Sequence, residues 1–413
     1  MRIAVIEDER PIREGLVHIL NKISPEYQVV GSAENGREGL ILLEEQDPDL
    51  ILLDIQMPDM NGLQMLKEAR KRGSMTKVVI LTAYSDFDYA KMSDEEAEEA
   101  REGLVEEKGF FILPSELFCN VRSKAADDEN LNETLEQVFR NIEESAKGSE
   151  SESDFEGLFD DYDVNNNKLG STVAKRNEKL VKLLNGVGEM NLGDVKEHSI
   201  DTFGDAYEYL MTMYASNAGK SGGEFFTPAD VSELLTRLGT VGKTEINKVY
   251  DPACGSGSLL LKAEKVLGKE AIRNGFYGQE INITTYNLCR INMFLHDIEF
   301  DKFNIACEDT LTSPQHWDDE PFELIVSNPP YSIKWAGKDD SLLINDPRFA
   351  PKGKADMAFI MHSLSWLAAN GTAAIVCFPG IMYRGGAEQK IRKYLVENNY
   401  VDCIIQLPGN LFF

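Results

Sequence analysis

Residues suited to catalysis by their type and order occur together in a short segment: Asn328, Pro329, Pro330 and Tyr331. It directly follows the apolar, β-branched run 322–326, which has the length and composition of a buried strand. Two prolines end such a strand and restrict the backbone that follows. Because open α/β sheets bind ligands at the carboxyl ends of their strands, we expect this turn to lie at a ligand site.

The chemistry that fits this turn is transfer of a methyl group to an exocyclic amine. An aromatic amino group is a poor nucleophile, since its lone pair is delocalised into the ring. The Asn328 side-chain oxygen and the Pro329 carbonyl would accept its two N–H groups and favour a more tetrahedral nitrogen. Tyr331 offers a flat face to a base flipped out of the stack. No strong base is needed, because attack on a sulfonium methyl leaves a neutral thioether. For this motif alone, an ordinary strand followed by a proline turn is the alternative interpretation.

A glycine-rich segment upstream has the pattern of a cofactor-binding turn. Residues 251–257 read Asp-Pro-Ala-Cys-Gly-Ser-Gly; they follow the strand-like pair 249–250 and lead into a helical pattern at 259–267. The glycines allow a tight turn and a close approach of a ligand to the backbone. The order of strand, glycine-rich turn and helix is typical of a cofactor site. A phosphate-binding loop does not fit, because no Gly-Lys-Ser/Thr follows.

Acidic residues end the next two expected strands. Glu280 follows the predicted strand 275–278, and Asp309 follows the predicted strand 303–307. An acidic residue at the end of the second strand usually binds ribose hydroxyls, and one after the third strand would reach an adenine amino group. We therefore expect a nucleoside-containing cofactor at this edge of the sheet.

In this order the motifs resemble those of the N6-adenine DNA methyltransferases, and most closely the modification subunit of type I restriction–modification systems. The resemblance rests on FFTP at 225–228, DPACGSG at 251–257, GQE at 278–280, EDTL at 308–311 and NPPY at 328–331. It implies a Rossmann-like domain that transfers a methyl group from S-adenosylmethionine to the N6 atom of adenine in DNA.

The resemblance also implies roles for individual residues. The cofactor would be bound by Phe226, Thr227, Asp251, Pro252, Gly255, Gly257, Glu280 and Asp309. The catalytic set would be Asn328, Pro329, Pro330 and Tyr331. Methylation of a glutamine amide in a protein is an alternative, because a planar amide also fits this turn. The FFTP segment and an acidic helical domain favour DNA.

The composition predicts a cytoplasmic protein of several domains. The 413 residues suffice for two or three domains, and no apolar run has the length of a membrane span. The six cysteines show no paired spacing, which favours a reducing compartment. The net charge of −28 opposes tight binding to DNA phosphates, and residues 93–163 alone carry 23 acidic and 6 basic side chains. We therefore expect a partner to supply DNA affinity, and the resemblance implies a specificity subunit and a restriction subunit.

Residues 1–90 have the pattern of a different α/β domain. Apolar strands alternate with helices there, which predicts a parallel sheet. The expected strands are 2–6, 27–30, 50–53 and 77–81. Glu7, Asp8 and Asp54 fall at strand ends, where together they would bind Mg²⁺ and a phosphoryl group. Surface acids without a metal are the alternative interpretation.

This segment resembles the flavodoxin-like receiver domain of two-component response regulators. The resemblance implies that Asp54 accepts a phosphoryl group, with a histidine kinase as partner, that Glu7 and Asp8 hold the metal, and that the Thr82 hydroxyl follows the phosphoryl group. The family's fifth strand, which ends in Lys-Pro, has no counterpart after residue 91, so a truncated receiver is expected. A response regulator with phosphorylation-controlled output is therefore an alternative function, and the absent lysine weighs against it.

The expected fold is α/β throughout, apart from a helical middle. The expected domains are a truncated receiver-like domain at 1–90, an acidic helical domain at 91–220 and a methyltransferase domain, truncated at its C-terminus, at 221–413. The abrupt change of pattern near 86–92 suggests a fusion of two truncated genes, natural or artefactual. Strands are expected at 372–377 and 401–407, and the family's last antiparallel strand would be missing.

Overall fold

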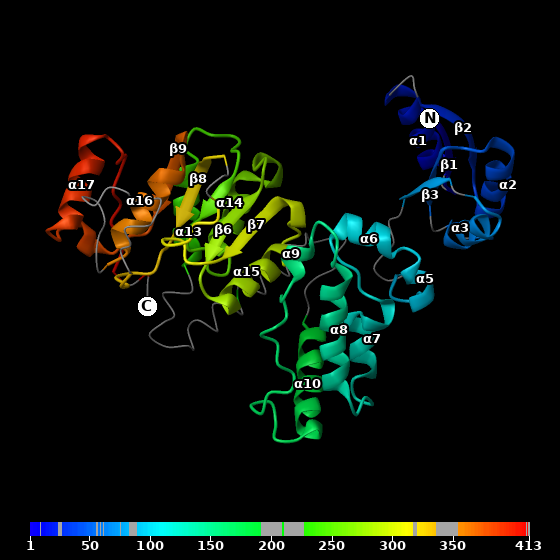
Figure 1. Ribbon diagram of the computed structural model, residues 1–413, viewed down its shortest axis with the longest axis horizontal. Helices are drawn as coiled ribbons and strands as arrows, with labels where there is room; N and C mark the ends of the chain where they lie inside the picture. Colours follow the sequence, from blue (N-terminus) through cyan, green and yellow to red (C-terminus); the bar gives the residue numbers. More distant parts are fainter. Residues whose placement is uncertain are drawn as a thin grey trace. The chain divides into compact units, whose positions relative to one another are not determined.

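The computed structural model forms two compact units, each of which is described by itself (Figure 1). One unit comprises residues 1–149 and 164–188, and the other comprises 150–163 and 189–413. The residues that the structure describes are 1–8, 10–23, 27–54, 57, 59–60, 62–74, 76–81, 89–190, 209, 227–316, 320–335, 354–409 and 411. Among them, no helix combines the length and the apolar character that a membrane span requires.

The first unit begins with a four-stranded parallel sheet in the order β2-β1-β3-β4. Its strands are β1 (Arg2–Ile6), β2 (Gln28–Ala33), β3 (Leu50–Asp54) and β4 (Lys77–Leu81). Its helices are α1 (Arg10–Ile23), α2 (Gly36–Gln46) and α3 (Gly62–Lys71). The middle strands β1 and β3 are buried because they consist almost entirely of aliphatic residues. The parallel sheet expected from the sequence is thus confirmed, and within the described residues no strand pairs with the outer side of β4.

The remainder of the first unit is helical. Its elements are α5 (Asp94–Glu98), α6 (Arg101–Lys108), η1 (Pro114–Glu116), α7 (Phe118–Lys124), α8 (Leu131–Ser145) and α10 (Val173–Gly188). Ser93 caps α5, because its hydroxyl accepts from the Glu96 amide while the Glu96 carboxylate accepts from the Ser93 amide. Helix α8 buries Leu131, Leu135 and other apolar residues at helical spacing, as its sequence pattern predicted.

The second unit contains a five-stranded parallel sheet in the order β7-β6-β5-β8-β9. Its strands are β5 (Val249–Asp251), β6 (Phe276–Glu280), β7 (Phe303–Cys307), β8 (Phe322–Ser327) and β9 (Leu367–Ile375). Its longer helices are α13 (Ala229–Gly239), α14 (Ser258–Leu267), α15 (Ile283–Leu295), α16 (Asp356–Trp366) and α17 (Ala387–Glu397). β5, the first strand of this sheet in sequence order, lies in its middle, so the strand order reverses between β5 and β8.

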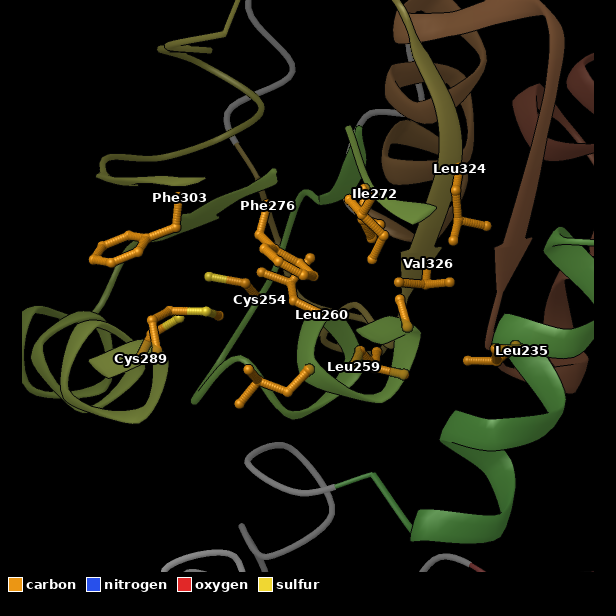
Figure 2. Packing of buried hydrophobic residues seen from close by; sticks show 14 of the residues in the cluster. Leu235, Cys254, Leu259, Leu260, Ile272, Phe276, Cys289, Phe303, Leu324 and Val326 are labelled. Carbon is orange, nitrogen blue, oxygen red and sulfur yellow. The ribbon is translucent and has the colours of Figure 1, made fainter. Parts of the chain in front are cut away.

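Side chains of alternate strand residues pack against helices on opposite faces of this sheet. On one face, Val326 and its strand neighbours join residues of α13, α14 and α15 in the largest core cluster. Figure 2 shows part of this cluster, to which strand residues such as Phe276 and helix residues such as Leu235 and Leu260 contribute. On the other face, Ile325 and its neighbours pack against Trp366 of α16. Among the described residues, helices therefore pack against both faces of the sheet.

A short segment between the helical elements of the first unit belongs to the second unit. Residues 150–163, which include α9 (Glu152–Phe155), pack on α15. The guanidinium of Arg290 donates to the carbonyls of Asp154 and Glu156 at 3.0 and 3.1 Å, and the Asn287 amide donates to the carbonyl of Gly157 at 3.1 Å. These bonds satisfy carbonyls at the end of α9 that have no partner inside the helix.

The C-terminal part differs from the sequence expectations in two places. The helix after residue 355 ends at Trp366, and β9 begins directly at Leu367, five residues before the strand expected at 372–377. The strand expected at 401–407 is wrong: these residues form no regular structure, and Ile404 is 65% exposed. An apolar run becomes a strand only where a neighbouring strand completes its hydrogen bonds, and the described residues offer none there.

Candidate active site at the carboxyl edge of the sheet

Four neighbouring strands of the second unit deliver their carboxyl ends to one edge. The glycine-rich loop follows β5, Glu280 ends β6, Asp309 follows β7, and Asn328 follows β8. The strand order reverses between β5 and β8, and this is where open α/β sheets bind their ligands. The structure therefore brings the described parts of all these motifs to one edge.

Two backbone amides of the glycine-rich loop donate hydrogen bonds to residues of β6. The Cys254 amide donates to the Gln279 carbonyl at 3.1 Å, and the Gly255 amide donates to the Glu280 carboxylate at 3.1 Å. Gly255 and Gly257 have φ angles of 56° and 83°, which other residues rarely adopt. A methyl group on Gly255 would meet no atom within 4 Å, whereas one on Gly257 would meet the Cys289 sulfur at 2.8 Å. Gly257 therefore permits packing against α15, and Gly255 leaves room for a ligand beside the backbone.

Asp251 is fully buried at the end of β5. Its Oδ1 atom accepts from the Ala253 amide at 3.0 Å, whereas its Oδ2 atom has no hydrogen-bond partner among the described residues. Burial raises the pKa of Asp251 to about 7, and the negative charge of Glu280 adds to the rise, while the Ala253 amide and the nearby Ser327 hydroxyl oppose it. A buried acceptor without a partner is costly, so a cationic or N–H-bearing ligand would relieve a cost already present here.

The loop that contains Asp309 is tied to the other loops through Gln279 and Thr310. The buried Gln279 side chain donates to the carbonyls of Glu308 and Ser313 at 3.1 and 2.9 Å. The Thr310 hydroxyl donates to the Pro252 carbonyl at 2.6 Å. The Asp309 carboxylate accepts from its own loop, at the Leu311 amide, and stays partly exposed. These bonds fix the loops after β5, β6 and β7 relative to one another.

The turn after β8 forms a hydrogen-bonded group of three side chains. The Asn328 amide nitrogen donates to the Thr227 hydroxyl at 3.1 Å, and the Tyr331 hydroxyl donates to the Asn328 oxygen. Asn328 is thus held from both ends, while its oxygen keeps a second lone pair. Within the described part of the chain no group donates to the Pro329 carbonyl. Burial raises the pKa of Tyr331 above its usual range, so its hydroxyl stays protonated and serves as a donor.

The structure describes every expected cofactor-binding and catalytic residue except Phe226. Pro252 and Pro329 are buried and shape their turns, and Pro330 is half-buried next to Tyr331. Phe226 lies outside the described residues, so its place at this edge remains a prediction. Thr227 directly follows it and contacts Asn328, so the expected cofactor-binding and catalytic residues are linked by a hydrogen bond.

Family models match three segments of the chain. The N-6 DNA Methylase model matches residues 198–413, which is more than half of the sequence. The chain belongs to the N-6 DNA methylase family. The HsdM N-terminal domain model matches residues 63–187, and the response regulator receiver domain model matches residues 3–99. The last two matches overlap over residues 63–99, which include the abrupt change of pattern noted in the sequence.

The curated and solved relatives agree with this N-6 DNA methylase assignment. A type I restriction enzyme MpnII methylase subunit from Mycoplasma pneumoniae is 52% identical over 79% of this chain and 64% of the relative. A type I restriction enzyme HindI methylase subunit from Haemophilus influenzae is 34% identical over 51% of this chain and 48% of the relative. The crystal structure of a type I restriction-modification system methyltransferase subunit from Streptococcus thermophilus has a TM-score of 0.66 at 33% identity, covering 76% of this chain and 66% of that one. The chain thus spans between about half and two thirds of the length of these relatives.

A second acidic site lies in the receiver-like sheet, outside the N-6 DNA methylase match. Glu7 follows β1 and Asp54 ends β3, and one ligand atom each from Glu7, Asp8 and Asp54 lies within 4.8 Å of the others. The structure therefore brings together the three carboxylates that the sequence placed at strand ends. Thr82 lies outside the described residues.

Three functional or supporting residues were missed from the sequence. Arg290, in α15, is the largest fully buried side chain among the described residues, and a single charged residue within the mostly apolar run 288–295 was a signal of a buried role. Asp356 and Arg384 contact the residue after the turn 328–331, but they lie 24 and 52 residues beyond it. No local pattern relates positions so far apart in the chain.

Proposed function

We propose that this chain is an S-adenosylmethionine-dependent DNA methyltransferase that modifies the N6 atom of adenine, as the modification subunit of a type I restriction–modification system. The observation that carries the proposal is the group formed by Thr227, Asn328 and Tyr331 beside the glycine-rich loop. We also propose the three-part division of the chain at about residues 90 and 220.

The described residues fit S-adenosylmethionine at the glycine-rich loop. The unpartnered Asp251 Oδ2 suits a ligand ammonium group, the open space at Gly255 suits a ligand that approaches the backbone, and Glu280 suits ribose hydroxyls. Asp309 would accept from the adenine amino group, with Pro252, Gly257 and Phe226 shaping the site. When bound, the cofactor supplies a methyl group on a positively charged sulfur.

The chain's own residues would orient the substrate amine. The free lone pair of Asn328 Oδ1 and the Pro329 carbonyl accept the two N–H groups of the amine, so that its lone pair turns out of the ring plane. Tyr331 fixes Asn328 through its hydroxyl and presents its ring to the base. Pro330 restricts the backbone between them. This preorganisation lowers the barrier mainly by orientation, because no proton has to leave before the methyl group is transferred.

The charge of the chain supports a partner for DNA binding, and the resemblance to type I modification subunits supplies the identity of the proposed partners. With a net charge of −28, the protein is poorly suited to hold DNA phosphates, so a specificity subunit would contribute most of the affinity and a restriction subunit would complete the complex. The name of the relative at 52% identity, a type I methylase subunit, supports this proposal.

Transfer of labelled methyl groups to adenine-containing DNA tests the proposal. The chain is mixed with a type I specificity subunit, DNA and labelled S-adenosylmethionine, and label in N6-methyladenine is measured. Asn328→Ala should lower the rate at least about 100-fold, because one acceptor is lost. Asn398→Ala, at the exposed end of α17, is the matched control and should leave the rate unchanged. Label in a glutamine-containing protein acceptor, but not in DNA, would refute DNA as substrate.

A second proposal concerns the receiver-like sheet. We propose that Glu7, Asp8 and Asp54 bind Mg²⁺ and that Asp54 accepts a phosphoryl group from a histidine kinase, because three carboxylates so close together repel one another unless a cation is shared. Calorimetric titration with Mg²⁺ tests the metal site: Asp54→Asn should weaken binding at least tenfold. Equal binding by the wild type and Asp54→Asn would contradict it.

A further inference from the structure

A buried group of charged side chains lies beside the chain that leaves the turn 328–331. Arg384 Nη1 is 3.2 Å from Glu388 Oε1 and 3.5 Å from Asp356 Oδ2. The side chains of Arg384, Glu388 and Asp356 are 18%, 11% and 4% exposed. One arginine therefore sits between two carboxylates with little access to water, where charge interactions are stronger than at the surface.

This group reaches the turn through Ser332, the residue directly after Tyr331. Arg384 Nη2 donates to the Ser332 hydroxyl at 3.2 Å, and the Ser332 amide donates to Asp356 Oδ1 at 3.2 Å. Ser332 has a φ of 55°, the left-handed conformation that costs a residue other than glycine about 1 kcal/mol. Such a conformation persists only where neighbouring groups hold it. Here the Ser332 amide is held by Asp356 and the Ser332 hydroxyl by Arg384.

A further backbone bond joins the residues after the turn to the start of α16. The Ala355 amide donates to the Ile333 carbonyl at 3.0 Å, so the chain after the turn is fastened to the start of α16 twice. Arg384 also lies over the Phe378 ring, 5.1 Å from its centroid. The position of the turn thus depends on residues of α16 and on those just before α17.

We propose that Asp356 and Arg384 are positioning residues, which fix the backbone of Ser332 and thereby hold the Asn328 and Pro329 acceptors in place for methyl transfer. The expected effect on methyl transfer rests on the proposed function, whereas the contacts that hold Ser332 do not depend on it. Buried ion pairs are seldom a strong source of stability, since removal of the charges from water offsets much of their attraction. Placement of one particular backbone turn is a role for which such a pair is well suited.

Hydrogen exchange measured by mass spectrometry tests the positioning directly in the whole chain. The variants are Asp356→Asn, which keeps the shape of the side chain but weakens its hydrogen bond, and Arg384→Lys, which keeps the charge but cannot bridge three acceptors. Lys393→Gln is the control, because it removes an exposed ion pair with Glu397 from the neighbouring helix α17. Both test variants should accelerate exchange in a peptide covering 328–333 at least about tenfold, while peptides from β5 and β6 and the control stay unchanged.

Two results would overturn the inference. Unchanged exchange at 328–333 in both variants would mean that the ion group does not hold the turn. Equal acceleration throughout the unit would mean that it supports the fold in general.

The methylation assay adds a catalytic measurement. Both variants should lower kcat about 10- to 100-fold while the Kd for S-adenosylmethionine changes less than twofold, because misplacement of the acceptors affects the reaction and not cofactor binding. An unchanged kcat would overturn the catalytic consequence. If the wild-type chain transfers no methyl group to DNA, the proposed function fails, and hydrogen exchange still decides whether Asp356 and Arg384 position the turn.

Discussion

Lowering the pH from 7.0 to 5.5 is expected to weaken the binding of S-adenosylmethionine, because Asp251 becomes protonated. Burial raises the pKa of this carboxyl group to about 7, so about half of the molecules carry the charge at pH 7.0 and about 3% at pH 5.5. If only the charged form binds the ligand ammonium, the Kd rises about 15-fold over this range. The ligand's own amino group stays largely protonated throughout, since α-amino groups titrate at about 7.7–8.0.

Isothermal titration calorimetry at both pH values, in buffers with different ionisation enthalpies, measures this effect. Binding at pH 5.5 should release close to one proton per ligand, and at pH 7.0 about half a proton. Asp251→Asn should bind weakly at both pH values, with no proton release from this position. The reasoning is refuted if the wild-type Kd changes less than twofold, or if Asp251→Asn shows the same pH dependence.

The same pKa shift has a consequence for folding, with a definite sign. The pKa of Asp251 in the folded chain, about 7, is higher than the ordinary value near 3.8 expected in the unfolded chain. The contribution of this group to stability is therefore complete below pH 3.8 and is lost as the pH rises through 7. The loss amounts to at most about 4 kcal/mol, at 1.36 kcal/mol per pKa unit. At pH 8, Asp251→Asn should accordingly raise the melting temperature of the second unit while weakening cofactor binding.

Three further changes give distinct expectations. Gly255→Ala, at a φ of 56°, should lower the free energy of unfolding by about 1 kcal/mol. It should also weaken cofactor affinity, measured by calorimetry, at least tenfold. Unaltered affinity would contradict a ligand beside this backbone. Arg290→Met should destabilise the second unit by about 3 kcal/mol in urea unfolding and expose residues 150–163 to protease, because three part-buried carbonyls lose their donor. Intact protection would show that the arginine is dispensable. Asp54→Asn should abolish labelling by acetyl phosphate with Mg²⁺, and Asp59→Asn, an exposed neighbour, should not; equal labelling would place the phosphate elsewhere.

The strand-end motifs could be predicted because a parallel sheet converts sequence order into spatial order. Each motif follows an apolar run of strand length, and parallel strands present all their carboxyl ends at one edge. Asp251, Glu280, Asp309 and Asn328 therefore meet at that edge as expected. Glu7 and Asp54 meet in the first sheet for the same reason.

Features that depend on partners far apart in the chain could not be predicted. Residues 401–407 have the composition of a strand but lack a neighbouring strand among the described residues, so composition alone was misleading. Arg290 binds carbonyls more than 130 residues earlier, and nothing in the local pattern of 150–163 indicates that it packs on α15. The ion group around Arg384 likewise becomes visible only when α16 and α17 are folded.

The hydrogen bond between Thr227 and Asn328 bears on how cofactor binding and catalysis are connected. Thr227 belongs to the segment proposed to hold the cofactor, and Asn328 is the proposed acceptor of the substrate amine. The planar Asn328 amide group thus connects Thr227 on one side to Tyr331 on the other. Arg384 and Asp356 fix the backbone end of the same turn. The turn is therefore held through the Asn328 side chain by Thr227 and Tyr331 and through the Ser332 backbone by Asp356, so loss of either set of contacts is expected to misplace the Asn328 acceptor.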